Sequence, residues 1–206
     1  RKLCVSLLGP AGSGKTTTLV VWRKTLLSLG FDVAWLSVAP EDNHPYRFLE
    51  CLVASVAQVD ADAAREAAIV LRHDAGESVI EHCVLSLAQG VAARPRDLVL
   101  IVDDLHAVDD QRIGDALQWL LEYAPPVLHL ALCSRTALPI PMSRLRAQRK
   151  LAEFDLRDLR FSAAETEQFL RAQIGDIDER VARQLHERTG GWIAGLAGTE
   201  TVGGQV

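Results

Sequence analysis

The sequence predicts an α/β fold in which a parallel sheet is covered by helices on both faces and is followed by a small helical segment. Three observations lead to this prediction. Short continuous apolar runs, typical of fully buried strands, alternate with longer stretches of helical periodicity, as in βαβ units. The first run leads through a glycine-rich turn directly into a helix. Beyond residue 160 the apolar runs stop and only helical patterns remain.

Five apolar runs are expected to form the strands, at residues 3–8, 32–38, 98–102, 127–133 and 151–156. Helices are expected at residues 15–29, at 77–93 and at 111–123, and a further helix is expected to begin at Pro45. An alanine-rich helical stretch follows it and is interrupted near 74–76. Gly30 and Pro125 supply stop signals for two of these helices. The helix that begins at Pro45 is amphipathic, because one of its faces carries Phe48, Leu49, Leu52, Val53 and Val56.

Two further helices make up the C-terminal segment. Ser162 and Glu165 have the spacing of a capping box, which indicates that a helix begins there. A second helix is expected at residues 177–188, and Gly190 with Gly191 ends it. We therefore expect residues 1–160 to form the sheet domain, 161–198 a helical lid subdomain, and 199–206 a linker or tail.

Composition narrows the classes of function. The 206 residues are 49% hydrophobic and 24% charged, which is typical of a globular domain. A formal net charge of −5 and an aromatic content of 5% argue against a nucleic-acid-binding surface. The four cysteines form no CxxC pair, so we expect buried reduced thiols rather than zinc ligands. No apolar run reaches the ~18 residues of a membrane span, and the chain opens at Arg1 without a signal peptide, so we expect part of a longer cytosolic protein.

The glycine-rich turn has the pattern GxxxxGK[ST], which is a phosphate-binding loop. Glycines let successive backbone N–H groups point inward at phosphate oxygens, and the helix that follows adds its positive end. Lys15 is expected to reach the β- and γ-phosphates, and the Thr16 hydroxyl to bind Mg²⁺. A turn that binds nothing is the alternative, but a strand before the motif and a helix after it favour phosphate. The predicted phosphate-binding residues are Gly9, Pro10, Ala11, Gly12, Ser13, Gly14, Lys15, Thr16 and Thr17.

Two carboxylates follow the third predicted strand. Asp103 and Asp104 stand at its carboxyl end, where open α/β sheets bind their ligands. We expect Asp103 to hold Mg²⁺ together with Thr16, and Asp104 to orient the attacking water. An aspartate after a strand is also a common turn residue, and that reading stays open for both. His106 lies in the same loop. It could contact the γ-phosphate, and the alternative is that it only makes a local hydrogen bond.

Arg135 follows the fourth predicted strand. If this strand lies between the first and the third, its end faces the γ-phosphate, where an arginine stabilises charge on the transferring group or reports that the phosphate is present. The alternative is a surface arginine, which a chain with 18 arginines among its 22 basic residues makes common. We include Arg135 with Lys15 and Asp104 among the candidate catalytic residues.

Five segments together resemble the nucleotide-binding module of the STAND-type ATPases, and within them the MalT-like regulators of the LuxR type. They are GPAGSGKTT, AWLSVAPEDNHPYRFLECLVASV, LVLIVDDLHAVDD, LALCSR and ERTGGWIAGL. The second is more specific than the phosphate-binding loop, since other P-loop proteins do not carry it. The resemblance spans nearly the whole chain.

The resemblance implies a P-loop three-layer sandwich with strand order 5-1-4-3-2, a helical lid, and a switch between an ADP-bound resting state and an ATP-bound oligomeric state. It gives Lys15, Thr16, Asp103 and Asp104 the roles already described, and Arg135 that of a sensor. Inducer-sensing repeats and a DNA-binding unit would follow this module in a longer chain.

The same resemblance places Trp192 in the lid, where packing in the lid core is favoured over contact with the base. The chain has two departures from the family pattern. Ala39 stands where the family often has an acid, with Glu41 and Asp42 as nearby substitutes. The segment that helps to hold adenine ahead of the loop is missing from these 206 residues.

The expected function is therefore a regulatory switch that binds ATP or ADP with Mg²⁺ and hydrolyses ATP slowly. We expect it in the cytoplasm, in contact with neighbouring domains or further copies, with no binding of DNA or membranes by these residues. Two alternatives remain. One is a housekeeping P-loop ATPase or kinase, which needs an acceptor pocket or strand-tracking basic loops. The other is a non-hydrolysing oligomerisation module that responds to nucleotide.

Overall fold

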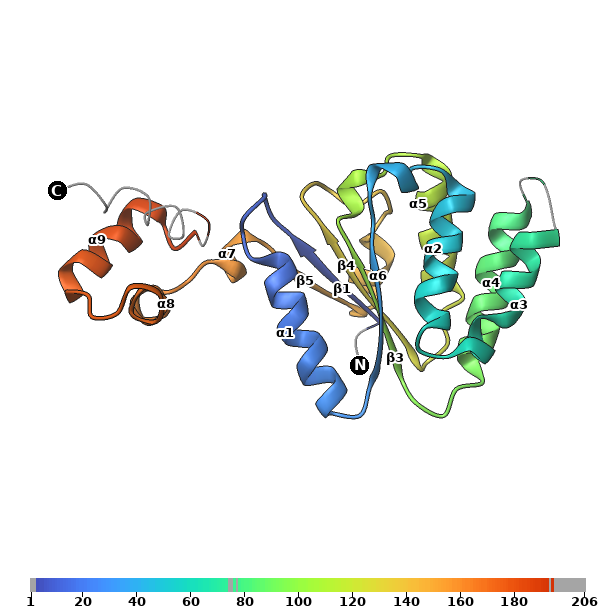
Figure 1. Cartoon of the computed structure of the whole chain (residues 1–206). Coiled ribbons are helices and arrows are strands. Elements are labelled where there is room, and N and C mark those ends of the chain that lie inside the picture. Colours follow the sequence, from blue (N-terminus) through green and yellow to red (C-terminus); the bar gives the residue numbers. More distant parts are fainter. Residues whose placement is uncertain (1–2, 74–75, 77, 193, 195–206) are drawn as a thin grey trace. The chain divides into compact units, whose positions relative to one another are not determined.

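A computed structural model describes residues 3–73, 76, 78–192 and 194, and they divide into two compact units (Figure 1). The sheet unit consists of residues 3–8 and 16–153. The helical unit consists of residues 154–194 together with residues 9–15, which contain most of the phosphate-binding loop. The predicted boundary at residue 160 stays a prediction, and the predicted tail at 199–206 lies outside the described residues.

The sheet has five strands in the order β2-β3-β4-β1-β5, so the predicted fold class and strand order are confirmed. The β2–β3, β3–β4 and β4–β1 pairs are parallel, and their registers align Ser37 with Asp103 and Leu8 with Ser134. The carboxyl ends of four strands therefore lie at one edge. The strands are β1 (Cys4–Leu8), β2 (Asp32–Ser37), β3 (Leu98–Asp103), β4 (Leu128–Ser134) and β5 (Leu151–Phe154).

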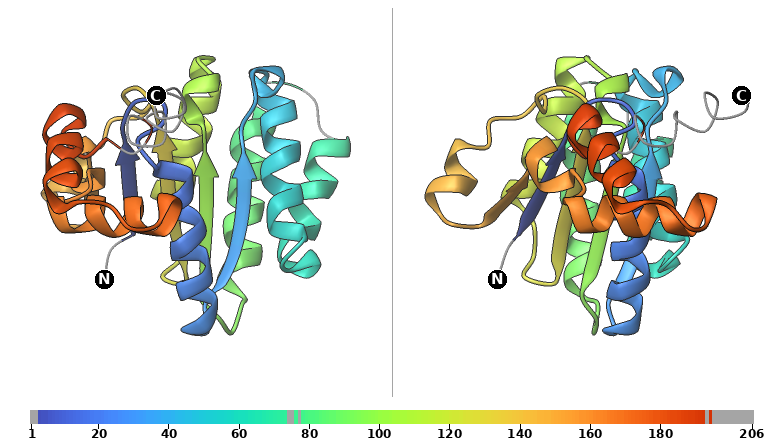
Figure 2. Two further views of the ribbon diagram at one scale, coloured as in Figure 1. Left: turned by 60° about the vertical axis from the view of Figure 1, so that its left-hand side comes forward. Right: turned by 90° about the vertical axis from the view of Figure 1, so that its left-hand side faces the viewer.

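Helices of the sheet unit cover both faces of the sheet. Figures 1 and 2 show α1 (Lys15–Ser28) on one side and α2 (Pro45–Ala57), α3 (Ala61–His73) and α4 (Ser78–Ala92) on the other. With α5 (Gln111–Glu122), helices α2 and α4 enclose the main core cluster. The side chains of Phe48, Leu100 and Leu117 are fully buried in it. All six residues of β3 are buried, which is why its sequence is continuously apolar until Asp103.

The helical unit contains α7 (Leu156–Leu159), α8 (Ala163–Ile174) and α9 (Glu179–Thr189). The predicted capping box is present, because the Ser162 hydroxyl accepts the Glu165 N–H and the Glu165 carboxylate accepts the Ser162 N–H. Gly190 ends α9 with φ of 58°, a backbone conformation that glycine adopts without strain. None of the described helices is long and apolar enough to cross a bilayer.

Four short elements were not predicted: η1 (Pro40–Asp42), η2 (Leu105–Ala107), α6 (Ser143–Ala147) and α7. Each has three to five residues, too few to show a helical period. The fifth strand ends at Phe154 rather than at position 156, because Asp155 caps α7. The last helix begins at Glu179 rather than at 177, because Asp178 caps it. The predicted interruption near 74–76 falls between α3 and α4, where positions 74 and 75 lie outside the described residues.

Candidate functional site

The phosphate-binding loop is folded around the carbonyl oxygen of Pro10. Lys15 Nζ donates to this oxygen at 2.9 Å, as does the Ser13 hydroxyl at 2.9 Å, and the Ser13 N–H lies at 3.4 Å. Gly12 and Gly14 adopt φ of 71° and 84°, so both positions use the backbone freedom of glycine. Lys15 is only 6% exposed. The loop thus holds a buried cation inside a turn whose glycines suit close approach of an anion.

Thr16 meets the acidic strand. Its hydroxyl donates to Asp103 Oδ2 at 2.9 Å, across 87 residues of sequence. Asp103 is 1% exposed at the end of β3, and its other oxygen accepts the Asp104 N–H at 2.9 Å. The structure therefore brings together the two residues that the sequence predicts as metal ligands. Both supply oxygen, the ligand atom that Mg²⁺ prefers, so this pair fits that ion.

Asp104 turns the chain out of the strand. Its φ of 60° is left-handed, which is uncommon outside glycine, although aspartate tolerates it better than most residues. His106 Nδ1 lies 3.7 Å from Asp104 Oδ1, so the two predicted residues are neighbours in one loop. Asp104 is half-buried and lies beside the buried Asp103.

Arg135 and the acids after β2 occupy the same edge of the sheet. β4 lies between β1 and β3, as expected, and exposed Arg135 follows it directly. Asp42 is buried and accepts the Ala39 N–H at 2.9 Å and Arg47 Nε at 3.0 Å, so its carboxylate holds its own loop together. Glu41 is exposed.

The C-terminal segment packs on the phosphate-binding loop within the helical unit. The Ala194 N–H donates to the Gly12 carbonyl at 3.2 Å. A Cβ added to Gly12 would lie 2.4 Å from Ala194 Cβ and 3.7 Å from Trp192 Cζ2. Trp192 is 41% exposed, so the expectation that it packs in the core of the lid is wrong. Because Gly12 carries no side chain, the Trp192 ring can lie beside the backbone of the loop.

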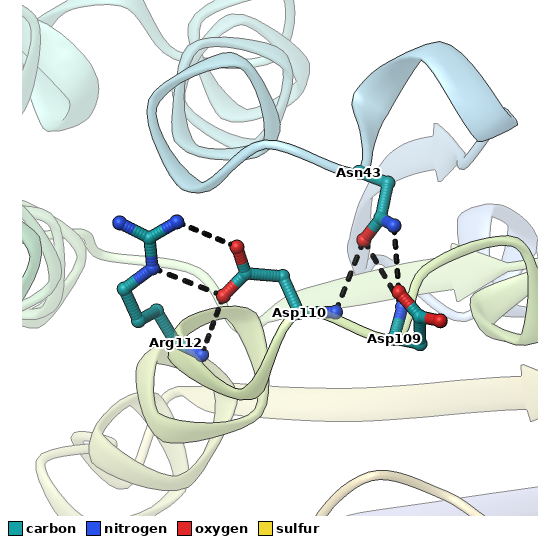
Figure 3. A network of polar contacts seen from close by, with 4 residues as sticks. All are labelled: Asn43, Asp109, Asp110 and Arg112. Atoms are coloured by element: carbon teal, nitrogen blue, oxygen red, sulfur yellow. Dashed lines mark hydrogen bonds and ion pairs between the residues drawn. The ribbon is translucent and has the colours of Figure 1, made fainter.

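Asn43 was not predicted as a site residue, although it lies in AWLSVAPEDNHPYRFLECLVASV, the most specific of the five segments. Figure 3 shows its amide joining the loop before α2 to the loop before α5. Oδ1 accepts the N–H groups of Asp109 and Asp110 at 3.0 and 3.1 Å, and Nδ2 donates to Asp109 Oδ1 at 2.7 Å. The sequence signal for Asn43 was that an amide residue follows β2, the strand next to β3. Whether β2 lies next to β3 depends on the strand order of the sheet.

Comparison with known proteins agrees with this geometry. Residues 1–132 match the model of the AAA ATPase domain family. The serine/threonine-protein kinase PknK of Mycobacterium tuberculosis is 30% identical over 197 residues, which cover 95% of this chain and 18% of the relative. The transcriptional regulator MalT of Cronobacter sakazakii is 28% identical over 191 residues, or 92% of this chain and 21% of the relative. The chain thus spans about a fifth of the length of these relatives, and the predicted resemblance to the MalT-like regulators is confirmed.

Solved structures support the fold. The Aeropyrum pernix ORC1 protein, solved in complex with DNA, has a TM-score of 0.52 and 16% identity over 92% of this chain and 50% of its own. Drosophila ORC bound to DNA has a TM-score of 0.50 and 20% identity, covering 91% of this chain and 44% of its own. Because the family model matches more than half of the sequence, the chain belongs to the AAA ATPase domain family.

Proposed function

We propose that this chain binds ATP with Mg²⁺ and acts as a slowly hydrolysing regulatory switch within a longer signal-transducing transcription regulator. The hydrogen bond between Thr16 and Asp103 carries the proposal. It joins a hydroxyl that follows the phosphate-binding loop to a buried carboxylate at the end of β3, as a magnesium–triphosphate site requires.

Each predicted residue has a role in this proposal. The loop N–H groups between Gly9 and Lys15, apart from Pro10, which has none, bind phosphate oxygens. The Lys15 ammonium leaves the Pro10 carbonyl for the β- and γ-phosphates. Thr16 and Asp103 would hold Mg²⁺, which when bound neutralises developing charge on the phosphates. Asp104 orients the attacking water, and Arg135 reports the γ-phosphate. Thr17, which is exposed at the start of α1, donates to a phosphate oxygen.

The names of the relatives favour a module whose output is supplied elsewhere. One relative is named as a protein kinase and another as a transcriptional regulator, yet each matches more than nine-tenths of this chain. We infer that the shared segment provides nucleotide-dependent control and that other domains or further copies are its partners. The net charge of −5 favours no DNA binding by these residues. Buried cysteine thiols suit the cytoplasm, where thiols stay reduced.

Isothermal titration calorimetry with ATP and ADP in the presence of Mg²⁺ tests nucleotide binding. Lys15→Ala should weaken ATP binding by at least about tenfold, because it removes a charge-assisted contact to phosphate. The matched control is Lys24→Ala, since Lys24 is an exposed lysine later in the same helix. Equal affinity of the Lys15 variant and the wild type would contradict the proposal.

Steady-state phosphate release separates the alternatives. A slow switch predicts low turnover that Asp104→Asn reduces further while ADP affinity is retained. Turnover stimulated by single-stranded DNA or by a small acceptor would instead favour a housekeeping motor or kinase. Tight nucleotide binding with no turnover, together with nucleotide-dependent assembly, would favour the oligomerisation module.

A further inference from the structure

We propose that Asn43 is a positioning residue that fixes the loop carrying Asp104, and thereby controls hydrolysis rather than nucleotide binding. This inference rests on the function proposed above. It assigns a role to the segment between β2 and α2, which contains none of the residues given a role in the proposed function.

The Asn43 side chain uses its acceptor and its donor on the same neighbouring loop. Its oxygen receives two successive backbone N–H groups, from Asp109 and Asp110, and its nitrogen donates to the Asp109 carboxylate. An amide that makes three hydrogen bonds to two adjacent residues fixes orientation as well as distance. Aspartate at this position would keep the acceptor, lose the donor and place a second negative charge beside Asp109.

Asp110 extends this contact into α5. Its carboxylate accepts the Arg112 N–H at 2.9 Å and caps the helix, and it also binds the Arg112 guanidinium through Nε at 3.0 Å and Nη2 at 2.7 Å (Figure 3). These hydrogen bonds from Arg112 hold the pKa of Asp110 below its usual value, so this carboxylate remains charged at neutral pH. Asn43 therefore contacts the start of a helix that is already fixed by its own cap.

The loop between β3 and α5 is anchored at both ends. At the β3 end, the Asp103 carboxylate accepts the Asp104 N–H, and the Asp103 carbonyl accepts the Val38 N–H at 3.0 Å from the β2 side. At the other end, Asn43 holds Asp109 and Asp110. Asp104, at the first of these anchors, adopts a left-handed conformation, which persists only where the surroundings fix it. Without Asn43, the loop that follows Asp104 loses its second anchor, and we expect the Asp104 carboxylate to be less fixed in direction.

Asn43 itself lies on a loop that is fixed from within. Asp42 accepts the Ala39 N–H and binds Arg47 in the first turn of α2, so the residue before Asn43 is held to the helix that follows it. The parallel register of β2 and β3 brings this loop beside the acidic one. Two ordered loops from neighbouring strands thus meet at one amide.

Hydrogen–deuterium exchange of the chain without nucleotide tests the positioning directly. Asn43→Ala removes all three hydrogen bonds, and Asn43→Asp removes the donor and places two carboxylates side by side. Each variant should therefore raise exchange of the amides of residues 104–110 by about tenfold. The double variant Asn43→Asp with Asp109→Asn exchanges donor and acceptor, and should restore exchange to within about twofold of wild type. Gln111→Ala, which removes a similar exposed amide bonded to Asp115, should change nothing in this segment.

Turnover provides the second readout. The Asn43 variants should lower kcat at saturating MgATP by about tenfold and leave ADP affinity within about threefold, with kcat recovered in the double variant. Wild-type exchange in both single variants, or a double variant that exchanges as fast as they do, would overturn the inference, as would an unchanged kcat. A wild-type chain that fails to bind MgATP would overturn the proposed function instead, and the exchange data would still decide the role of Asn43.

Discussion

Gly12 combines two constraints at one residue of the phosphate-binding loop. Its φ of 71° belongs to the left-handed region, and the space that a Cβ would occupy is filled by the Cβ of Ala194 at 2.4 Å. An alanine at position 12 would have a strained backbone, and its Cβ would clash with Ala194. The glycine thus admits both the curvature of the loop and the close approach of the C-terminal segment.

Gly12→Ala should therefore lower ATP affinity by at least about fivefold, since about 1–2 kcal/mol of backbone strain falls on the loop itself. Gly30→Ala is the matched control, because Gly30 has φ of 86° with no atom near the added Cβ and lies outside the loop. Calorimetry measures both affinities. An affinity lowered equally in both variants would contradict this account.

The buried thiols give a prediction that is independent of nucleotide. Burial raises the pKa of Cys4 and of Cys83 to about 12. At pH 8 only about 10⁻⁴ of each is the reactive thiolate. Iodoacetamide labelling of the native chain, followed by mass spectrometry, should leave both unmodified, whereas all four cysteines should react after denaturation. Fast native labelling of Cys83 would contradict the packing of α4.

At the scale of one element, the first turn of α8 depends on a carboxylate. Glu165 accepts the N–H and the hydroxyl of Ser162, each at 2.8 Å. Its hydrogen bond with the backbone of Ser162, and then that with the hydroxyl, lower the pKa of Glu165 from its usual 4.5. A carboxylate with a lowered folded pKa contributes stability above its unfolded pKa and loses it as the pH falls through the folded value.

Protection of the first turn of α8 against hydrogen exchange should therefore be constant from pH 7 to about 5 and should fall below about 4. Glu165→Gln removes the titrating group, and this variant should show weaker protection at neutral pH with no such fall. Exchange rates are corrected for their intrinsic pH dependence. A wild-type profile without a decrease at low pH would contradict the role of the capping box.

At the scale of the whole molecule, the sheet unit is stabilised by one continuous core between the sheet and α2, α4 and α5. Leu100 on β3 is fully buried in it. A cavity at Leu100 would adjoin both strands and helices. We therefore expect it to lower the free energy of unfolding of residues 16–153 as a whole. Residues 9–15 of the phosphate-binding loop belong to the helical unit, whereas Thr16 and Asp103 belong to the sheet unit.

Leu100→Ala should lower the free energy of unfolding by about 2–5 kcal/mol. Leu29→Ala is the control, since Leu29 is 68% exposed and its truncation should change stability by less than about 0.5 kcal/mol. Urea titration followed by circular dichroism measures both. Equal midpoints for the two variants would contradict the assignment of the core.

Local patterns predicted most of the fold. Continuous apolar runs identified the buried strands, because a parallel strand covered on both faces needs apolar residues at every position. Glycine, proline and capping residues marked the helix ends for the same local reason. The four helical elements of three to five residues were missed, since so short a stretch shows no helical period.

The sequence by itself determined the phosphate-binding loop and the acidic strand end, because glycine freedom, a lysine and a carboxylate act through spacing along the chain. Only the tertiary structure decided which groups meet across it. The contacts of Thr16 with Asp103, and of Asn43 with Asp109, span 87 and 66 residues and exist because parallel strands bring their carboxyl ends to one edge. The exposed place of Trp192 beside Gly12 likewise follows from packing, which no local pattern encodes.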